Sequence, residues 1–255
     1  MIPSMRLDVY LFEYGYVDSR SEAKSFITSG AVWVNTDIVT KPSYIVKDND
    51  IVNVDKSGKR FVSRGGLKLE GALDNFNINV KGRLALDIGA SSGGFTDCLL
   101  KRGAEHVIAV DSGFGQMVKV LQADARVTSR ENFNARYMIP SDLQYAPDLV
   151  VMDVSFISAT RIIPAVYRCI STPGDFICLI KPQFEVGRSG VGKGGIVRDA
   201  KKQNDAVDGV VEFAKGCGFE FIGLMQSPIT GGDGNIEFLA HFRKEIVNEE
   251  GNSDT

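Results

Sequence analysis

The chain has 255 residues, of which 44% are hydrophobic and 24% are charged, and its formal net charge at pH 7 is −3. This length allows one large domain with a buried core and a second, smaller domain. No apolar run reaches membrane-spanning length and no signal peptide opens the chain, so we expect a cytoplasmic protein without membrane contacts. Four scattered cysteines and only two histidines exclude a disulfide framework and a histidine-pair metal site, and we expect no bound metal.

The first part of the chain predicts a small α+β domain over residues 1–55. Residues 5–12 have apolar side chains at helical spacing, and Ser19 followed by Glu22 is typical of a capped helix start. The elements predicted here are two helices and then two short strands, over residues 5–12, 19–27, 31–35 and 50–55. Such a short segment builds only a marginal core, so we expect this domain to pack against the rest of the chain.

Residues 84–111 predict a strand, a glycine-rich turn, a helix and a second strand that ends in a carboxylate, Asp111. This order is typical of nucleoside sites in α/β proteins, where glycine lets a ligand approach the backbone and the acid meets ribose hydroxyls. The turn G-A-S-S-G-G differs from the dinucleotide form G-x-G-x-x-G, and Asp87 precedes its first glycine. A carboxylate there would repel a pyrophosphate but suits a cationic ligand, which favours S-adenosylmethionine over NAD. The alternative is an ordinary turn whose glycines serve packing alone.

The candidate cofactor-binding residues come from this turn and from the ends of the strands around it. They are Asp87, Gly89, Ala90, Ser91, Gly93, Gly94, Phe95, Asp111, either Glu131 or Asn132, and Asp153.

The second half of the chain continues the α/β alternation. Three further strands and one helix are predicted at residues 147–153, 175–181, 238–242 and 161–169. This pattern predicts a Rossmann-like, doubly wound parallel sheet. Because the carboxyl ends of parallel strands line one crevice, we expect Asp111, Asp153 and Lys181 to face the same ligand.

The net charge argues against a generic RNA-binding protein, but the charge is unevenly distributed. Residues 56–70 and 178–203 each carry a net charge of +4, whereas the tail over 245–255 holds acids and no base. We expect that tail to be disordered. The basic segment 56–66 is either a plain linker or part of a binding surface, and the glycine-rich loop 187–195 is an RNA clamp, a lid or a linker.

Two runs near the N-terminus carry a family resemblance. R-L-D-x-x-L, followed by S-R-S-E-A-K-x-x-I-x-x-G-x-V-x-V-N, resembles the RNA-binding domain named after small-subunit ribosomal protein four. The resemblance implies that the second helix and the hairpin lie along structured RNA, with Arg6, Arg20, Lys24 and Asn35 on phosphates. The alternative is a solvated helix face, since residues 1–55 contain more acids than bases.

Five motifs extend the resemblance over nearly the whole chain. They are V-S-R-G-G-x-K-L at 62–69, L-D-I-G-A-S-S-G-G-F-T-D at 86–97, V-M-D-V-S-F-I-S at 151–158, L-I-K-P-Q-F-E at 179–185 and G-K-G-G-I-V-R-D at 192–199. Together they resemble the TlyA family, whose members join the RNA-binding domain to an FtsJ-like methyltransferase and are often labelled hemolysins. The resemblance implies S-adenosylmethionine-dependent 2′-O-methylation of cytidine in 16S or 23S ribosomal RNA, or both, with ribosomal subunits as partners.

The same resemblance implies a catalytic set of Lys68, Asp153, Lys181 and Glu237. A ribose 2′-hydroxyl must lose its proton as the methyl group arrives, and a lysine accepts it only where burial or a neighbouring cation depresses the lysine pKa. We expect Lys181 to be the base, Lys68 to hold the hydroxyl oxygen, and the two acids to orient the ammonium groups. The alternatives are a surface lysine beside a helix cap, an inactive RNA-binding assembly factor, or a hemolysin that acts on membranes.

The predicted domain organisation has four parts: an RNA-binding domain over 1–55, a linker over 56–66, a methyltransferase domain over 67–244 and a tail over 245–255. The candidate RNA-binding residues are Arg6, Arg20, Lys24, Asn35, Arg60, Arg64, Arg188 and Lys193.

Overall fold

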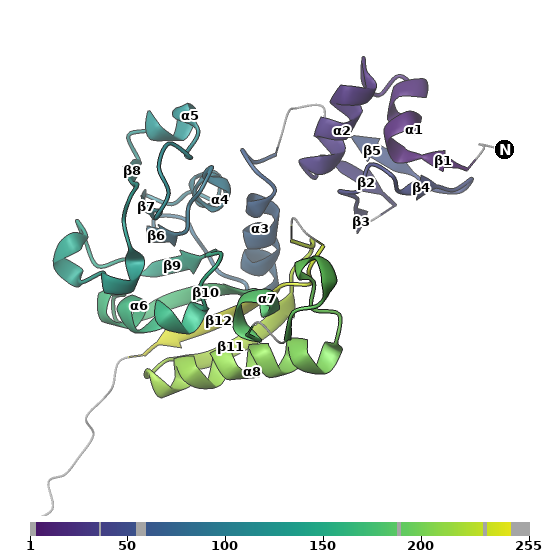
Figure 1. Ribbon diagram of the computed structural model, residues 1–255. Coiled ribbons are helices and arrows are strands. Elements are labelled where there is room, and N and C mark those ends of the chain that lie inside the picture. The colour runs from purple at the N-terminus through teal and green to yellow at the C-terminus, as the bar shows by residue number, and fades with distance from the viewer. Residues whose placement is uncertain (1–3, 36, 55–59, 188–189, 232–233, 246–255) are drawn as a thin grey trace, which may run out of the picture.

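The computed structural model describes residues 4–35, 37–54, 60–187, 190–231 and 234–245. It consists of a small N-terminal domain and a larger α/β domain (Figure 1). Of the expected tail, only residue 245 is described. Residues 56–59 of the expected linker also lie outside the described residues.

The N-terminal domain packs two helices against short strands. The elements are β1 (Met5–Arg6), α1 (Leu7–Glu13), α2 (Arg20–Thr28), β2 (Val32–Val34), β3 (Asp37–Ile38), β4 (Ile45–Val46) and β5 (Val52–Val54). Leu7, Leu11 and Ile27 are fully buried between them. The side chain of Ser19 accepts a hydrogen bond of 3.1 Å from the backbone N–H of Glu22, as the cap motif predicted. The strands β1, β3 and β4 are each two residues long and were not predicted.

The larger domain is built on a seven-stranded sheet. Its strands are β6 (Leu84–Ile88), β7 (His106–Val110), β8 (Val127–Arg130), β9 (Leu149–Met152), β10 (Gly174–Ile180), β11 (Glu220–Gln226) and β12 (Phe238–Lys244). They lie in the order β11-β12-β10-β9-β6-β7-β8. The strands from β10 to β8 pair in parallel, and β12 is antiparallel to both β10 and β11.

The helices of the described residues of this domain lie on both faces of this sheet (Figure 1). They are α3 (Gly65–Asn75), α4 (Gly94–Lys101), α5 (Lys119–Gln122), α6 (Ile163–Cys169), α7 (Pro182–Glu185) and α8 (Ala200–Gly216). Single 3-10 turns occupy Ala135–Tyr137, Pro140–Asp142, Ala159–Arg161 and Lys193–Gly195.

Alternate residues of each central strand belong to different cores. In β9, Val150 and Met152 pack with α6 and α8, whereas Leu149 and Val151 pack with α3 and α4. A strand directs successive side chains to opposite faces, so a parallel sheet covered on both sides needs an unbroken apolar run. This requirement explains why the inner strands were predictable from the sequence, whereas the edge strands β8 and β11, which have no buried residue, were not predicted.

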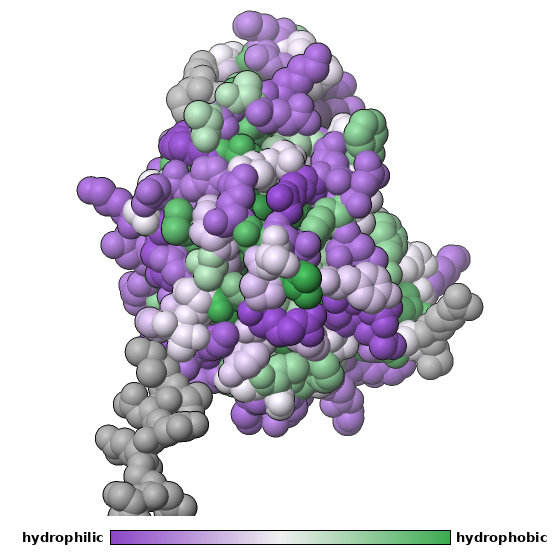
Figure 2. All heavy atoms as spheres, turned by 90° about the vertical axis from the view of Figure 1, so that its left-hand side faces the viewer, coloured by the Kyte–Doolittle hydropathy of each residue, from purple (hydrophilic) through white to green (hydrophobic). Residues whose placement is uncertain are grey.

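The edge of the sheet at β8 faces the viewer in Figure 2, where hydrophilic residues predominate and hydrophobic ones are scattered among them. Among the described residues, no helix has the length and apolar character needed to cross a membrane.

Candidate active site

The glycine-rich turn lies directly after β6 and leads into α4. Gly89 has a φ of 83° and Gly93 a φ of 97°, values in the left-handed region that favours glycine. A Cβ atom on Gly89 would lie 2.3 Å from the carbonyl oxygen of Asp153. The turn therefore packs against the end of β9 so closely that only glycine fits there.

Beside this turn is a cavity of about 320 Å³ that is lined by two carboxylates, Asp111 and Asp153, and by both polar and apolar side chains. Asp111, after β7, lines it and accepts hydrogen bonds from the backbone N–H groups of Ser91, at 2.8 Å, and Gly113, at 2.7 Å. These bonds fix the carboxylate and leave oxygen lone pairs for a ligand. The apolar side chains around the cavity include Phe133, Ile157 and Ile162. Carboxylates and polar groups beside apolar side chains suit a nucleoside, whose ribose is polar and whose base is flat.

Asp87 lies beneath the turn, and its side chain is fully buried away from this cavity. One carboxylate oxygen accepts a 2.6 Å hydrogen bond from the hydroxyl of Thr96 on α4, and the other has no partner among the described residues. Burial raises the pKa of Asp87 to about 7. Its observed contact is with the helix that follows the turn.

Glu131 and Asn132, the two alternative cofactor-binding candidates, come directly after β8. The Glu131 carboxylate accepts backbone N–H bonds from Gly115 at 2.7 Å and Gln116 at 2.8 Å, and these bonds lower its pKa. It thus holds the loop after Asp111. The residues that line the cavity at this point are the next two in the chain, Phe133 and Asn134.

Two lysine–carboxylate pairs lie at the carboxyl edge of the sheet. Lys68 on α3 is 2.5 Å from Glu237, the residue before β12, and Lys181 after β10 is 2.6 Å from Asp153 after β9. Lys181 also donates a 2.8 Å hydrogen bond to the hydroxyl of Ser155. The exposed fractions of these four charged side chains are only 3 to 20%. The sheet topology therefore unites four residues from distant parts of the sequence.

Both lysines and Glu237 line one further cavity, also of about 320 Å³, together with Phe156 and Phe184. Phe156 is 91% exposed and has a φ of 65°, which is rare for a bulky residue, and its ring centroid lies 5.3 Å from that of Phe184. We call this space the lysine cavity. It offers two lysine amines, one carboxylate and two aromatic rings to a single ligand, and Asp153 lies just outside it, paired with Lys181.

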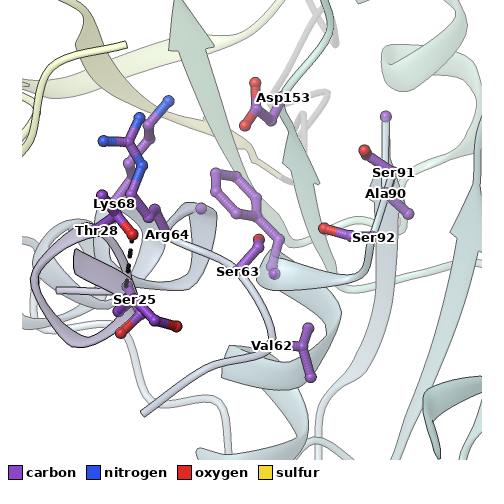
Figure 3. Close-up of a pocket in the computed structure, with 15 residues that line it drawn as sticks. Ser25, Thr28, Val62, Ser63, Arg64, Lys68, Ala90, Ser91, Ser92 and Asp153 are labelled. Atoms are coloured by element: carbon purple, nitrogen blue, oxygen red, sulfur yellow. Dashed lines mark hydrogen bonds between the residues drawn. The ribbon is translucent and has the colours of Figure 1, made fainter. Parts of the chain in front are cut away.

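A third cavity, of about 450 Å³, lies between the two domains, and we call it the interdomain cavity (Figure 3). Residues of α2 line one side, Arg64 and Lys68 lie next to them, and Ser91 and Ser92 of the turn lie opposite. Lys68 also lines the lysine cavity, and Asp153 also lines the cavity beside Asp111. The three cavities therefore meet at the catalytic candidates.

Comparison with protein-family models accounts for both domains. Residues 61–244 match the model described as FtsJ-like methyltransferase, and residues 5–52 match the S4 domain. The chain belongs to the FtsJ-like methyltransferase family. The expected α/β fold, a Rossmann-like methyltransferase sheet preceded by a small α+β domain, is confirmed.

Relatives of this FtsJ-like protein cover nearly its whole length. The 16S/23S rRNA (cytidine-2′-O)-methyltransferase TlyA of Mycobacterium tuberculosis is 42% identical, over 94% of this chain and 90% of the relative. Hemolysin A of Brachyspira hyodysenteriae is 45% identical, over 93% of this chain and 99% of the relative. A solved structure from Streptococcus thermophilus, provisionally named a hemolysin, is 42% identical and superposes with a TM-score of 0.73 over 96% of this chain and 90% of its own. The expected TlyA-type resemblance is thus confirmed.

Several candidate RNA-binding residues of this FtsJ-like protein lie in ion pairs. Arg6 and Arg20 lie 2.9 Å and 3.8 Å from Asp8, whose side chain is buried and whose pKa is lowered by the hydrogen bond from Arg6. Arg60 lies 2.5 Å from Glu70 on α3. The structure therefore gives these arginines partners within the protein.

The remaining candidates are placed differently. Asn35 hydrogen-bonds Asp50 at 2.9 Å, Lys24 and Lys193 are exposed, and Arg64 lines the interdomain cavity. Arg188 lies outside the described residues.

The sequence reasoning missed the aromatic and amide side chains of the lysine cavity. Phe156 and Phe184 lie inside the quoted motifs V-S-F-I-S and K-P-Q-F-E, as does Gln183, whose buried Oε1 has no hydrogen-bond partner among the described residues. These three residues follow Asp153 and Lys181, which come directly after two strands, within three positions, and this spacing was the signal that the sequence offered.

Proposed function

We propose that this FtsJ-like methyltransferase transfers the methyl group of S-adenosylmethionine to the 2′-hydroxyl of a cytidine in ribosomal RNA, within ribosomal subunits in the cytoplasm. The observation that carries the proposal is a cavity lined by two buried lysines, each paired with a carboxylate, which adjoins a second cavity of nucleoside size. The substrate class follows from the TlyA relative and from the S4 domain.

The residues beside the turn fit the cofactor. Asp111 would hold the ribose hydroxyls, and the apolar walls around Phe133 would enclose the adenine. S-adenosylmethionine, when bound there, supplies a methyl group on a positively charged sulfur. Asp153 lines the same cavity and would provide a negative charge that favours this sulfur.

The lysine cavity would receive the target nucleotide. Lys181, as the neutral amine, accepts the proton of the 2′-hydroxyl while the oxygen takes the methyl group. Lys68, as the ammonium, donates a hydrogen bond to that oxygen as negative charge develops on it. Asp153 and Glu237 hold the two amines in place, and Phe156 and Phe184 offer rings on which the base can stack. Positioning of the oxygen in line with the methyl group supplies much of the remaining acceleration.

Replacement of Lys181 tests this proposal. Lys181→Ala should abolish incorporation of tritiated methyl groups into purified ribosomal subunits and leave the S-adenosylmethionine affinity, measured by calorimetry, near that of the wild type. The matched control is Lys215→Ala, which removes an ammonium paired with Glu212 on the surface of α8. Lys215→Ala should transfer methyl groups at the wild-type rate.

Three outcomes would count against the proposal. Full activity of Lys181→Ala would exclude the lysine as base. Methylation mapped to a base instead of a ribose would exclude the 2′-hydroxyl. Cofactor binding by the wild type without any methyl incorporation would instead favour an inactive assembly factor.

A further inference from the structure

The interdomain cavity has a wall that comes from the N-terminal domain. Ser25 and Thr28 at the end of α2 line it from one side. The glycine-rich turn with Ser91 and Ser92, which we call the cofactor turn, lies across from them (Figure 3). Such a wall means that the RNA-binding domain reaches to the edge of the catalytic site.

A close contact holds the two domains in this arrangement. Gly30, just after α2, packs so tightly against α3 that a Cβ atom on it would lie 2.0 Å from a methyl carbon of Leu67. Leu67 is buried in the core of the larger domain, and Ile38 of β3 packs against that same core. Since Leu67 precedes Lys68, the end of α2 is fixed next to one of the two catalytic lysines.

The charged groups that line the interdomain cavity favour an anion. Only three of its lining residues are charged, namely Arg64, Lys68 and Asp153. Lys68 is paired with Glu237 and Asp153 with Lys181, whereas Arg64 has no carboxylate within 4 Å among the described residues. The guanidinium of Arg64 is therefore left to attract an anion from outside the protein.

Hydroxyl groups complete the site. The Thr28 hydroxyl donates to the backbone carbonyl of Lys24 at 2.8 Å, and the buried Ser29 hydroxyl donates to that of Phe26 at 2.9 Å. The Ser25 hydroxyl makes no such bond among the described residues and is exposed, so its donor remains available.

We propose that Ser25 and Arg64 together bind one backbone phosphate of the RNA strand, next to the nucleotide that enters the lysine cavity. The inference rests on the proposed function, because it assumes that an RNA nucleotide occupies the lysine cavity. Lys68 lines both cavities, so a strand whose ribose meets Lys68 continues into the interdomain cavity. The N-terminal domain then helps to set which nucleotide of a bound strand reaches the lysines.

The carboxylate of the cofactor is the other anion that this cavity could attract. The cofactor turn lies on the far side of the cavity from Ser25, and Arg64 lies on the side of α2 (Figure 3). This arrangement favours the RNA phosphate, and separate measurements of RNA and cofactor affinity distinguish the two anions.

The experiment adds and removes positive charge at this site. Ser25→Lys should tighten binding of ribosomal RNA and steepen the slope of log K against log salt concentration by about 1. Arg64→Gln should weaken binding roughly tenfold and make that slope shallower by about 1. The affinity for S-adenosylmethionine should stay unchanged in both variants.

The matched control is Ser21→Lys, which adds the same charge on the same helix, one turn earlier and outside the cavity. Equal effects of the two lysine substitutions, or a change of cofactor affinity with RNA affinity unaltered, would overturn the inference. A wild-type protein that fails to methylate subunits would refute the proposed function. Normal methylation by the wild type, combined with unaltered RNA binding by Ser25→Lys and Arg64→Gln, would refute this inference alone.

Discussion

Lys68 and Glu237 are 169 residues apart in the chain, yet their side chains form an ion pair of 2.5 Å that is almost completely buried. One partner lies on α3 and the other precedes β12, so the pair joins the first helix of the methyltransferase domain to its last strand. Water screens such a pair weakly, and neither charge can lose its partner without a large cost.

Glu237→Ala should therefore destabilise the protein by about 3 to 5 kcal/mol, because Lys68 would remain buried without a counter-charge. Urea unfolding measures this change. The matched control is Asp205→Ala, which breaks the exposed Lys201–Asp205 pair of 2.8 Å and should cost less than about 1 kcal/mol.

The double variant Lys68→Met with Glu237→Leu separates stability from catalysis. It replaces both charges by apolar side chains and should recover most of the stability lost in Glu237→Ala. It should nevertheless transfer no methyl groups. Normal activity of this double variant would show that the pair serves the fold alone.

The pKa of Asp87 predicts a dependence of stability on pH. Its pKa is about 7 in the folded protein and about 3.9 in an unfolded chain, so the folded state holds the proton more tightly between these values. The stabilisation is complete below about pH 4 and is lost as the pH rises through about 7. Compared with Asp87→Asn, the wild type should lose free energy of unfolding between pH 5 and pH 8, as measured in urea. Identical pH profiles of the two proteins would show that the carboxyl keeps its ordinary pKa.

The glycine turn gives a test of close packing. Gly89→Ala should disrupt both the cofactor site and the fold, because its Cβ would lie 2.3 Å from the Asp153 carbonyl oxygen. Gly82→Ala is the matched control, with a similar φ of 76° and nothing within 4 Å. It should cost only the backbone strain, about 1 to 2 kcal/mol, and leave cofactor affinity unchanged. Equal losses in both variants would remove the argument for contact with Asp153.

The sequence predicted the five inner strands of the sheet of the larger domain and its charged edge, but not the edge strands β8 and β11. Apolar runs marked β6, β9 and β10 because strands buried on both faces must be apolar throughout. The edge followed from topology, since acids and lysines after parallel strands share one crevice. The very short strands of the N-terminal domain carry too few residues for a recognisable alternation.

The sequence could not assign partners to single side chains. The contact of Asp87 with Thr96 depends on the angle of α4, and the pairing of Arg6 with Asp8 depends on the rotamers of both. The wall formed by Ser25 depends on how two domains dock, and no local pattern encodes that relation. The family resemblance assigned Arg6 and Arg20 to RNA phosphates, whereas the structure pairs both with Asp8.

Gln183 in α7 offers a last test, in which stability and activity should change in opposite directions. Its Oε1 is buried beside the lysine cavity without a hydrogen-bond partner among the described residues, and an unpaired buried acceptor costs about 1 to 3 kcal/mol. Gln183→Met, of similar volume, should therefore raise the free energy of unfolding by about 1 kcal/mol. If the amide oxygen accepts a hydrogen bond from the amino group of the target cytosine, the variant should also have a lower kcat/KM on ribosomal subunits. It should then discriminate less between cytidine and uridine at the target position. A stabilised variant with unchanged kcat/KM and unchanged base preference would show that the amide does not contact the substrate.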